Sequence, residues 1–355
     1  MAENNVILSV KDLEVKFKVR DRVLTAIRNI SLDFIEHQVV AIVGESGSGK
    51  SVFTKTFTGM LDMNGEVTHG EIWFEGRNLM DIKTDKGWEE IRGRKIATVF
   101  QDPMTSLNPV RTIGYQISEV IMKHQKKSSE EAKKEAIELM GRVGIQNPEQ
   151  RYDEYPFMFS GGMRQRIVIA IALACHPKIL ICDEPTTALD VTIQAQIIRL
   201  IKDLAKEYDF TTIYITHDLG VVANVADAVA VMYAGQIIEY GSVEDVFYDS
   251  RHPYTWGLLS SLPQLGMKGE KLFAIRGTPP SLFEEIKGDA FAPRSEYSMK
   301  IDFEKEPPIF RISDTHWAKT WLLDPRAPKV EPPEAIRSLH QRMIGLTSKG
   351  GVYGE

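Results

Sequence analysis

The sequence predicts an α/β fold, in which helices cover the faces of a largely parallel β-sheet. Between residues 160 and 235, helical and strand patterns alternate along the chain, as they do when helices connect parallel strands. Two short runs in this region, 179–182 and 211–216, have the composition of strands that are buried in such a sheet. Together these observations indicate a layered α/β domain.

The first segment of the chain, residues 6–43, is predicted to form strands. Polar and apolar residues alternate over VILSVKDLEVKF, a polar turn follows near Asp21, and SLDFIEHQVVAIV ends in a buried β-branched run. A glycine-rich turn and then a helix are expected next. A further pair of strands is plausible around EIWFEG, at 71–76.

The middle of the chain has helical segments. Residues 114–145 have helical character, and the run Ser128-Ser129-Glu130-Glu131 is typical of a helix N-terminus. Helical spacing returns from Ile193 to Tyr208.

The last third of the chain differs in composition. Beyond about residue 250, prolines become frequent and the periodicity fades. We therefore expect one domain at 1–250, followed by a small, loop-rich C-terminal extension at 251–355.

Composition excludes several classes of protein. The 355 residues carry a net charge of −6, which argues against broad nucleic-acid binding because that requires a basic face. Cys175 and Cys182 both lie in apolar runs, so buried thiols in a reducing cytosol are expected rather than disulfides. The N-terminus lacks the pattern of a signal peptide, and no run approaches the roughly 20 apolar residues that a membrane-spanning helix requires. Any membrane role must therefore go through a partner.

The segment GESGSGKS, residues 44–51, is the clearest functional motif. Its glycines allow backbone N–H groups to surround the phosphates of a nucleotide, Lys50 adds a positive charge, and the Ser51 hydroxyl can ligate Mg²⁺. A flexible glycine turn is the alternative, but the predicted strand before the segment and the helix after it favour a phosphate-binding loop. The residues expected to contact nucleotide here are Gly44, Ser46, Gly47, Gly49, Lys50 and Ser51.

A second candidate segment follows the predicted strand at 179–182 and consists of Asp183 and Glu184. The end of a buried parallel strand delivers its side chains to the sheet edge where ligands of α/β folds bind. Asp183 is expected to hold Mg²⁺ through water, and Glu184 to act as general base toward the attacking water. Because many strands end in charged turns, this pair is informative only together with the phosphate loop.

A third segment, Ser160-Gly161-Gly162, opens a helix and completes a family resemblance. The phosphate loop, SGGMRQR, DEP and TALD before a later histidine resemble the ATPase domain of ABC transporters over roughly residues 6–250. The resemblance implies a P-loop ABC-type nucleotide-binding domain, with a RecA-like core, an antiparallel β subdomain and a helical subdomain at about 104–165. It also implies dimerisation. A helix N-cap would explain Ser160 but not the two glycines. The residues that would cap ATP held by the other subunit are Ser160, Gly161, Gly162 and Gln165.

Further positions match the same family pattern. Gln101 resembles the glutamine that contacts Mg²⁺ and water and senses the membrane partner, and His217 resembles the switch histidine that contacts the γ-phosphate. Ala188-Leu189-Asp190 resembles the loop that links the two ATP sites of the dimer. Phe17 is the candidate for stacking on adenine, and a role in the core explains it nearly as well. The resemblance thus implies catalytic roles for Glu184, His217 and Gln101, and Mg²⁺ ligation by Ser51, Gln101 and Asp183.

A closer resemblance indicates the kind of transporter. The segments 101–109, 251–255 and 276–282 are similar to those of ATPase subunits of bacterial oligopeptide and dipeptide permeases. That family implies peptide uptake with a second homologous ATPase subunit, two transmembrane permease subunits and an extracellular peptide-binding protein, this chain lying peripherally at the cytoplasmic face of the membrane. An importer of nickel or of a glycoside stays open. A soluble ABC ATPase of DNA repair or translation is the third alternative, although the second ATPase domain or long coiled coil usual there is absent from the sequence.

The sequence departs from that family in the extension. Many relatives carry four cysteines there that can hold an iron–sulfur cluster, and the matching positions here are Asp289, Ser295, Asp302 and Thr320. Because such a cluster requires thiolates, none is expected, and an oxygen-ligand site for Mg²⁺ or Ca²⁺ is the alternative to plain loss of the metal. The extension is then expected to fold around a small core of its own, formed by Phe291, Tyr297, Ile301, Phe303, Phe310, Trp317 and Trp321.

Overall fold

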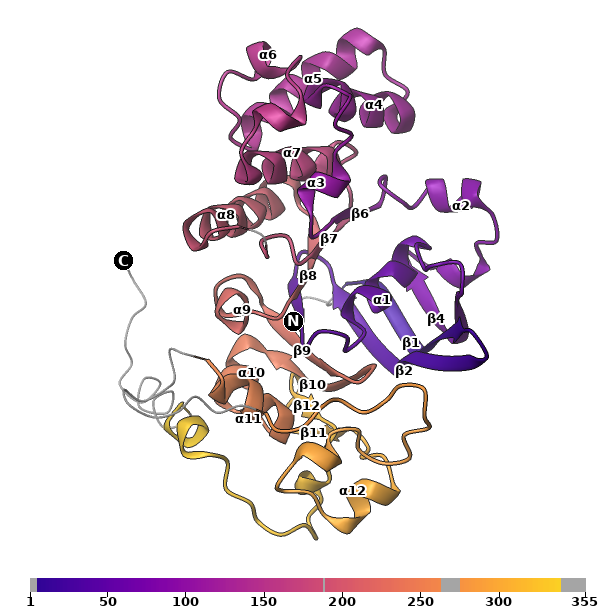
Figure 1. Ribbon diagram of the computed structural model, residues 1–355, viewed down its shortest axis with the longest axis vertical. Coiled ribbons are helices and arrows are strands. Elements are labelled where there is room, and N and C mark those ends of the chain that lie inside the picture. The colour runs from indigo at the N-terminus through magenta and orange to yellow at the C-terminus, as the bar shows by residue number, and fades with distance from the viewer. Residues whose placement is uncertain (1–4, 188, 263–274, 340–355) are drawn as a thin grey trace.

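The computed structural model describes residues 5–187, 189–262 and 275–339. Within these residues the strands form two sheets, one of eight strands and one of four. Figure 1 shows a group of helices at one end of the molecule, the smaller sheet beside its middle and the C-terminal extension at the other end. The α/β fold class predicted from the sequence is confirmed.

The larger sheet has the strand order β11-β12-β10-β9-β3-β8-β7-β6. The strands from β9 to β6 run parallel to one another, and every residue of β8 is buried. Burial on both faces explains why the two strands predicted at 179–182 and 211–216 are so poor in charged residues. Both are confirmed. The parallel strands are β3 (Val39–Val43), β6 (Ile96–Val99), β7 (Ile179–Asp183), β8 (Thr211–Thr216) and β9 (Ala228–Tyr233).

The smaller sheet is antiparallel, with the strand order β2-β1-β4-β5. As predicted, a turn at 20–21 joins its first two strands, and alternate side chains of β1 are buried. The strands expected at 71–76 are displaced, because Glu75 and Gly76 have φ of 49° and 76° and form the turn itself. The strands are β1 (Val6–Val19), β2 (Arg22–Ile35), β4 (Gly65–Phe74) and β5 (Arg77–Asn78).

The helical character of residues 114–145 resolves into two helices, α4 and α5, joined by a short connection. Lys126 has φ of 58° and ends α4, and Ser128 with Glu131 forms a capping box that begins α5. The predicted helix start is therefore confirmed. The helix at 161–173 shares a hydrophobic cluster with α4 and α5. The helices are α3 (Pro103–Ser106), α4 (Ile113–Gln125), α5 (Ser129–Arg142), α6 (Pro148–Arg151) and α7 (Gly161–Leu173).

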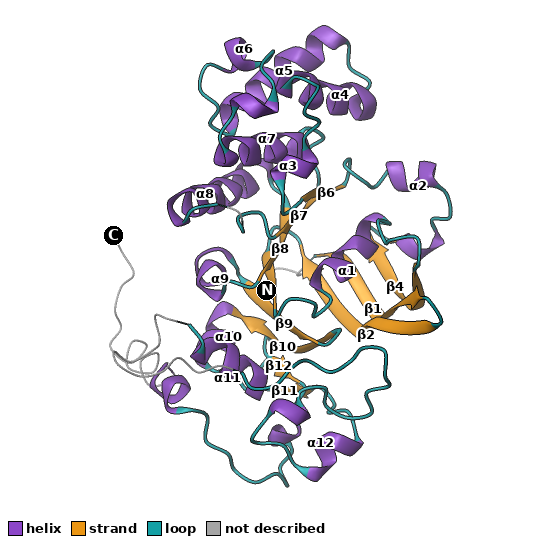
Figure 2. Cartoon of the chain, in the orientation of Figure 1, coloured by secondary structure: helices purple, strands orange, loops and turns teal. Residues whose placement is uncertain are grey.

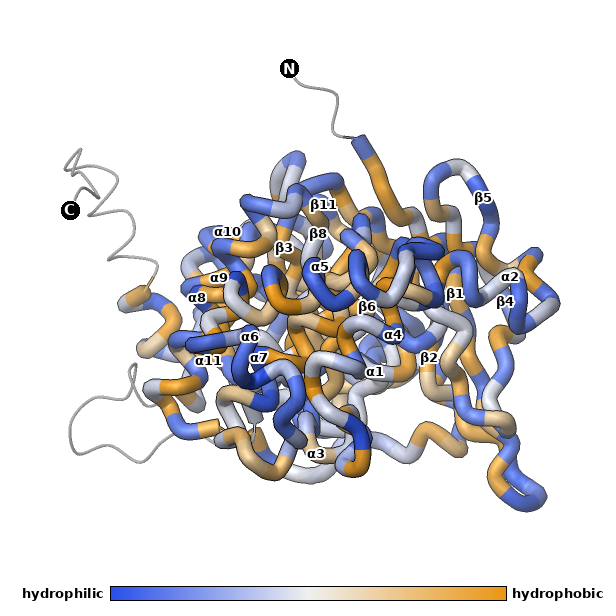
Figure 3. Tube along the Cα trace, turned by 90° about the horizontal axis from the view of Figure 1, so that it is seen from above, coloured by the Kyte–Doolittle hydropathy of each residue, from blue (hydrophilic) through white to orange (hydrophobic). Residues whose placement is uncertain are grey.

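The remaining helices lie around the sheets, and Figure 3 shows apolar stretches alternating with hydrophilic ones along the chain, many of them in the middle of the view. The helix expected from Ile193 to Tyr208 is confirmed as α8, which begins two residues earlier. These helices are α1 (Lys50–Lys55), α2 (Asp85–Glu89), α8 (Val191–Tyr208), α9 (Leu219–Val225), α10 (Val243–Tyr248), α11 (Pro253–Ser260) and α12 (Lys300–Glu304). Among the described residues, none of the helices is both long and apolar enough to cross a membrane.

The two cysteines differ from each other in their surroundings. Cys182 is fully buried on β7, and this burial raises the pKa of its thiol. Cys175 was expected to be buried too, but α7 ends at Leu173 and Cys175 lies in the following turn, only partly buried. Burial nevertheless raises the pKa of Cys175 to about 11. Both thiols are therefore protonated at neutral pH.

The extension does not form a core of its own, so that expectation is wrong. Phe291 is 2% exposed and packs in the same cluster as Tyr233 and Tyr254, whereas Phe303 is 56% exposed. Figure 2 shows that loops dominate this region, and such short segments bury more apolar surface against an existing sheet than against each other. The strands β11 (Phe310–Arg311) and β12 (Trp317–Ala318) extend the larger sheet through β10 (Gln236–Ser242).

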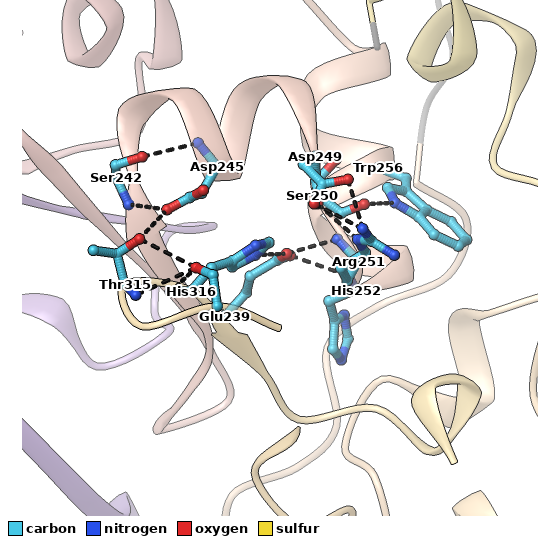
Figure 4. Close-up of polar contacts among 11 residues, drawn as sticks. Glu239, Ser242, Asp245, Asp249, Ser250, Arg251, His252, Trp256, Thr315 and His316 are labelled. Carbon is cyan, nitrogen blue, oxygen red and sulfur yellow. Dashed lines mark hydrogen bonds and ion pairs between the residues drawn. The ribbon is translucent and has the colours of Figure 1, made fainter. Parts of the chain in front are cut away.

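A buried polar network joins the extension to β10 (Figure 4). Glu239 is fully buried, and its carboxylate accepts the backbone N–H groups of Arg251 and His252 at 2.6 and 3.1 Å. The Nε2 atom of His316 lies 2.9 Å from the same carboxylate. One side chain of the main sheet thus holds both the start of α11 and the strand β12.

The four positions that match cluster cysteines have local roles. Each side chain accepts a hydrogen bond from a backbone N–H two or three residues away: Asp289 from Phe291, Ser295 from Tyr297, Asp302 from Met299 and Thr320 from Leu322. At these four positions side-chain oxygen atoms therefore accept the hydrogen bonds that hold turns and a helix start of the extension. Across the described residues, no group of three or more His, Cys, Asp and Glu side chains is placed to hold a metal ion.

Candidate functional site

The phosphate-loop motif lies between β3 and α1, at the carboxyl edge of the parallel strands. Gly44 and Gly49 have φ of 153° and 106°. A Cβ at Gly44 would come within 2.1 Å of the carbonyl oxygen of Met232, and one at Gly49 within 2.9 Å of that of Ala26. Gly47, with φ of 79°, faces open space. The loop therefore needs glycine for close packing at two positions and for backbone conformation at the third.

Lys50 lies inside this loop. Its side chain is buried, and Nζ donates to the carbonyl oxygens of Gly44 and Glu45 at 2.8 and 2.9 Å. Burial lowers the pKa of Lys50, while Glu184, Asp183 and Glu45 act to raise it. A buried ammonium group beside loop N–H groups has the charge and position to bind a phosphate.

The end of β7 meets the start of α1 at a pair of oxygen ligands. Ser51 Oγ donates to Asp183 Oδ1 at 2.9 Å, although 132 residues separate them. Burial raises the pKa of Asp183, and the hydrogen bond from Ser51 partly opposes this rise. Ser48 Oγ, also in the loop, is buried without a hydrogen-bond partner among the described residues. A hydroxyl and a carboxylate held together suit a hard cation such as Mg²⁺, so the residues fit the predicted metal.

Glu184 is the centre of a cluster of polar side chains. Its carboxylate lies 3.3 Å from Gln101 Nε2, which follows β6, and 3.3 Å from His217 Nδ1, which follows β8. The Thr187 hydroxyl donates to it at 2.9 Å. Glu184 itself has φ of 47°, an uncommon conformation for this residue type. Its N–H donates to the carbonyl oxygen of Ile215. The structure thus brings together three residues that the sequence assigned separately.

Thr187 was missed in the sequence. Its position three residues after Glu184, in a turn that follows the strand, was the available signal, since Thr hydroxyls commonly bond side chains and backbone in such turns. Glu45 was also overlooked, because the phosphate-loop motif accepts any residue at its position.

The Ser160-Gly161-Gly162 segment begins α7. Ser160 is the N-cap and accepts the Met163 N–H at 3.4 Å, while Gly161 is exposed. A Cβ at Gly162 would come within 2.6 Å of Ile193, so this glycine lets α7 and α8 approach closely. Within the described residues, no hydrogen bond joins this segment to the phosphate loop.

Other residues predicted to contact nucleotide do not share one common setting. Gln165 is fully buried, and neither of its side-chain polar atoms has a partner among the described residues, so it does not share the exposed surface of Ser160. Asp190 is exposed at the start of α8, and Ala188 lies outside the described residues. Phe17 is 8% exposed, with its ring against Gly65 in the smaller sheet. Contact of these residues with nucleotide stays a prediction.

Comparisons with known proteins agree with this geometry. The ABC transporter family model matches residues 27–187, and the model for the oligopeptide/dipeptide transporter C-terminal region matches 238–301. Among solved structures, the ATP-binding cassette MJ0796, a dimer bound to ADP and Pi, is 28% identical with a TM-score of 0.60, over 66% of this chain and 98% of that one. The fold and the phosphate-loop site define an ATP-binding cassette ATPase.

Curated relatives cover nearly the whole chain. The oligopeptide transport ATP-binding protein AmiE of Streptococcus pneumoniae is 65% identical over 96% of this chain and 96% of its own length. The corresponding figures for OppD of Bacillus subtilis are 57%, 97% and 96%, and for the dipeptide transport protein DppD of Lactococcus lactis 55%, 96% and 98%. The chain therefore belongs to the family of oligopeptide and dipeptide transport ATP-binding proteins.

Proposed function

We propose that this protein is the ATP-hydrolysing motor subunit of an ABC importer that takes up oligopeptides through partner membrane subunits. The observation that carries the proposal is the assembly of the phosphate loop, the Ser51–Asp183 pair and the Glu184 cluster at one edge of the parallel sheet. The names of the relatives support peptides as the cargo.

Binding of ATP is assigned to the loop and its neighbours. Backbone N–H groups of Gly44, Ser46, Gly47 and Gly49, together with Lys50, surround the β- and γ-phosphates, and Phe17 supplies an aromatic face for adenine. Ser51, Asp183 and Gln101 would hold Mg²⁺, which would neutralise part of the phosphate charge.

Hydrolysis is assigned to Glu184. Its carboxylate accepts a proton from the attacking water as that water adds to the γ-phosphorus, and the bond from this phosphorus to the β–γ bridging oxygen breaks, which releases ADP and phosphate. Gln101 and His217, each 3.3 Å from the carboxylate, and Thr187 at 2.9 Å restrict its orientation. The proton acceptor is thereby held in place before the reaction, which lowers the cost of aligning it with water.

A complete ATP site is assigned to a pair of ATPase subunits. Ser160, Gly161 and Asp190 are exposed, so they can reach a second subunit, whose ATP they would cap together with Gly162 and, after movement, the buried Gln165. We infer that the second subunit is a homologous ATPase. Two transmembrane permease subunits and an extracellular peptide-binding protein complete the assembly, and this chain lies peripherally at the cytoplasmic face.

The proposal is tested by isolating the assembly and measuring transport. The tagged chain is purified from detergent-solubilised membranes, its partners are identified by mass spectrometry, and the complex is reconstituted into liposomes. We expect the liposomes to take up a labelled oligopeptide only when ATP is present. We expect this uptake to stop in the Lys50→Ala variant. Uptake of nickel or a glycoside in place of peptide would overturn the cargo, and a chain recovered only from the soluble fraction would favour a soluble ATPase.

A further inference from the structure

An arginine of the C-terminal extension, Arg294, contacts the phosphate loop. Both terminal nitrogens of Arg294 donate to the Glu45 carboxylate, at 2.8 and 3.0 Å, across 249 residues of sequence. Arg294 Nε also donates to the Arg276 carbonyl at 2.8 Å, and one terminal nitrogen lies 3.2 Å from the Tyr233 hydroxyl. The guanidinium group therefore joins two loops of the extension to the end of β9 and to the phosphate loop.

The arginine side of this contact is shielded from water, whereas the Glu45 side chain is 28% exposed. The Arg294 side chain is 5% exposed, and its guanidinium carbon lies 5.7 and 5.9 Å from the ring centres of Tyr233 and Phe291. Two parallel hydrogen bonds between a guanidinium group and a carboxylate restrict orientation as well as distance, and shielding strengthens them. The pair thus differs from an exposed ion pair, which would contribute little.

Glu45 is held at its backbone as well. Its N–H donates to the hydroxyl of Tyr254 on α11 at 2.8 Å, and its carbonyl oxygen accepts from Lys50 Nζ at 2.9 Å. The side chain, N–H and carbonyl of this one residue therefore connect to Arg294, to Tyr254 on α11 and to the phosphate-binding lysine. A shift of Glu45 would move the lysine and the loop N–H groups together.

We propose that Arg294 is a positioning residue for nucleotide binding, which holds the phosphate loop in its nucleotide-receiving conformation through Glu45. A loop that is ordered before the ligand arrives loses less entropy on binding. In addition, the guanidinium group balances the charge of a carboxylate that would otherwise repel the phosphates. The inference rests on the proposed binding of nucleotide at this loop. It implies that the affinity of the loop for nucleotide depends on a residue of the extension.

The first test compares MgADP affinity of full-chain variants by isothermal titration calorimetry. Arg294→Ala is expected to weaken binding about tenfold, with Arg294→Lys between it and the parent because it keeps the charge without the paired hydrogen bonds. Arg326→Ala is the matched control, since Arg326 makes a similar paired contact with Asp324 within the extension and is 85% exposed. Unchanged affinity in a folded Arg294→Ala protein would overturn the proposal.

The second test asks whether Arg294 acts through Glu45. Glu45→Gln alone is expected to weaken MgADP binding, and adding Arg294→Ala to it should cost little more. An equal loss from Arg294→Ala in both backgrounds would contradict the inference, and Glu45→Gln also provides the test if Arg294→Ala does not fold. In the assembled transporter KM for ATP should rise while kcat stays near the parent value, because Arg294 does not touch Glu184. If the parent itself binds no MgADP, the proposed function fails instead.

Discussion

The carboxylate of Glu184 is surrounded by an amide, a hydroxyl and an imidazole that come from three different connections of the sheet. An isolated carboxylate on a turn would sample several rotamers, whereas these contacts restrict it. The backbone also restricts this residue. Glu184 has a left-handed conformation, and its N–H donates to the carbonyl oxygen of Ile215, which keeps the turn against β8. The residue is therefore oriented before any substrate arrives.

Replacement of this carboxylate tests its assignment as a base. Glu184→Gln is expected to keep MgATP binding and to lose hydrolysis by roughly 100-fold or more, because the amide has the same shape but accepts no proton from water. Lys50→Ala should instead weaken nucleotide binding itself. Calorimetry and phosphate release from the assembled complex provide the two measurements. Hydrolysis at the parent rate in Glu184→Gln would show that the base lies elsewhere.

Asp289 predicts a pH dependence of stability. Burial raises the pKa of Asp289 to about 6, repulsion from Asp302 adds to this, and the Phe291 N–H, Arg28 and Lys319 oppose it. Because the folded state holds the proton more tightly than the unfolded state, this group favours folding at low pH, and that contribution is lost as pH rises from about 4 to about 6.

Asp289→Asn should therefore stabilise the protein at pH 7.5, by about 1–3 kcal/mol, and have little effect near pH 4. The neighbouring His252 is neutral throughout this range, since burial lowers its pKa to about 3. Urea unfolding at the two pH values measures the difference. An equal effect at both values would assign it to packing rather than to the charge of Asp289.

At the scale of elements, β10 connects the ATPase domain to the extension. Its residue Glu239 accepts two backbone N–H groups at the start of α11 and faces His316, which precedes β12 (Figure 4). Both side chains are buried, at 0% and 1% exposed. The short strand β12 has few ladder hydrogen bonds, so this side-chain contact is a large part of what holds it to the sheet.

His316→Ala is expected to destabilise the protein by about 1–3 kcal/mol, because it removes one partner of a buried polar pair and leaves a small cavity. His69→Ala, at an exposed position of β4, serves as the control and should leave the melting temperature unchanged. Thermal unfolding of the full chain measures both variants. Equal melting temperatures for the two variants would mean that β12 is held by its other contacts.

At the scale of the whole molecule, the extension and the ATPase domain share one hydrophobic cluster. Tyr233 and Tyr254 pack with Phe291 at ring-centre distances of 5.3 Å, and Ile336 is buried in the same cluster. The domain boundary predicted at residue 250 rests on composition and stays a prediction. The shared hydrophobic cluster continues across that position. A substitution that unfolds the extension is therefore expected to destabilise the ATPase domain as well.

The exposed position of Ser160 and Gly161 bears on the activity of the isolated chain. In the proposed assembly each ATP site takes these residues from a second subunit, so one chain alone supplies half of each site. We expect its ATPase rate to be at least about tenfold below that of the assembled complex. Phosphate release, measured with the oligomeric state followed by light scattering, tests this. Rapid turnover by a demonstrably monomeric chain would contradict the need for a dimer.

Local patterns were sufficient for several elements. The capping box of Ser128, the strands at 179–182 and 211–216 and the glycine positions of the phosphate loop depend on near neighbours and on periodicity. The placement of Asp183 and Glu184 beside the loop also followed, because parallel strands end at one sheet edge. These features were predictable since each constrains backbone conformation or burial within a few residues.

Tertiary structure alone decided the remaining features. The apolar character of Phe291 and Phe303 did not reveal that one packs on the ATPase domain while the other faces solvent. The burial of Gln165 and the contact between Arg294 and Glu45 were equally hidden. Periodicity indicates which face of an element is apolar, but not which distant surface covers it. That choice depends on the packing of the whole chain, where segments 249 residues apart come into contact.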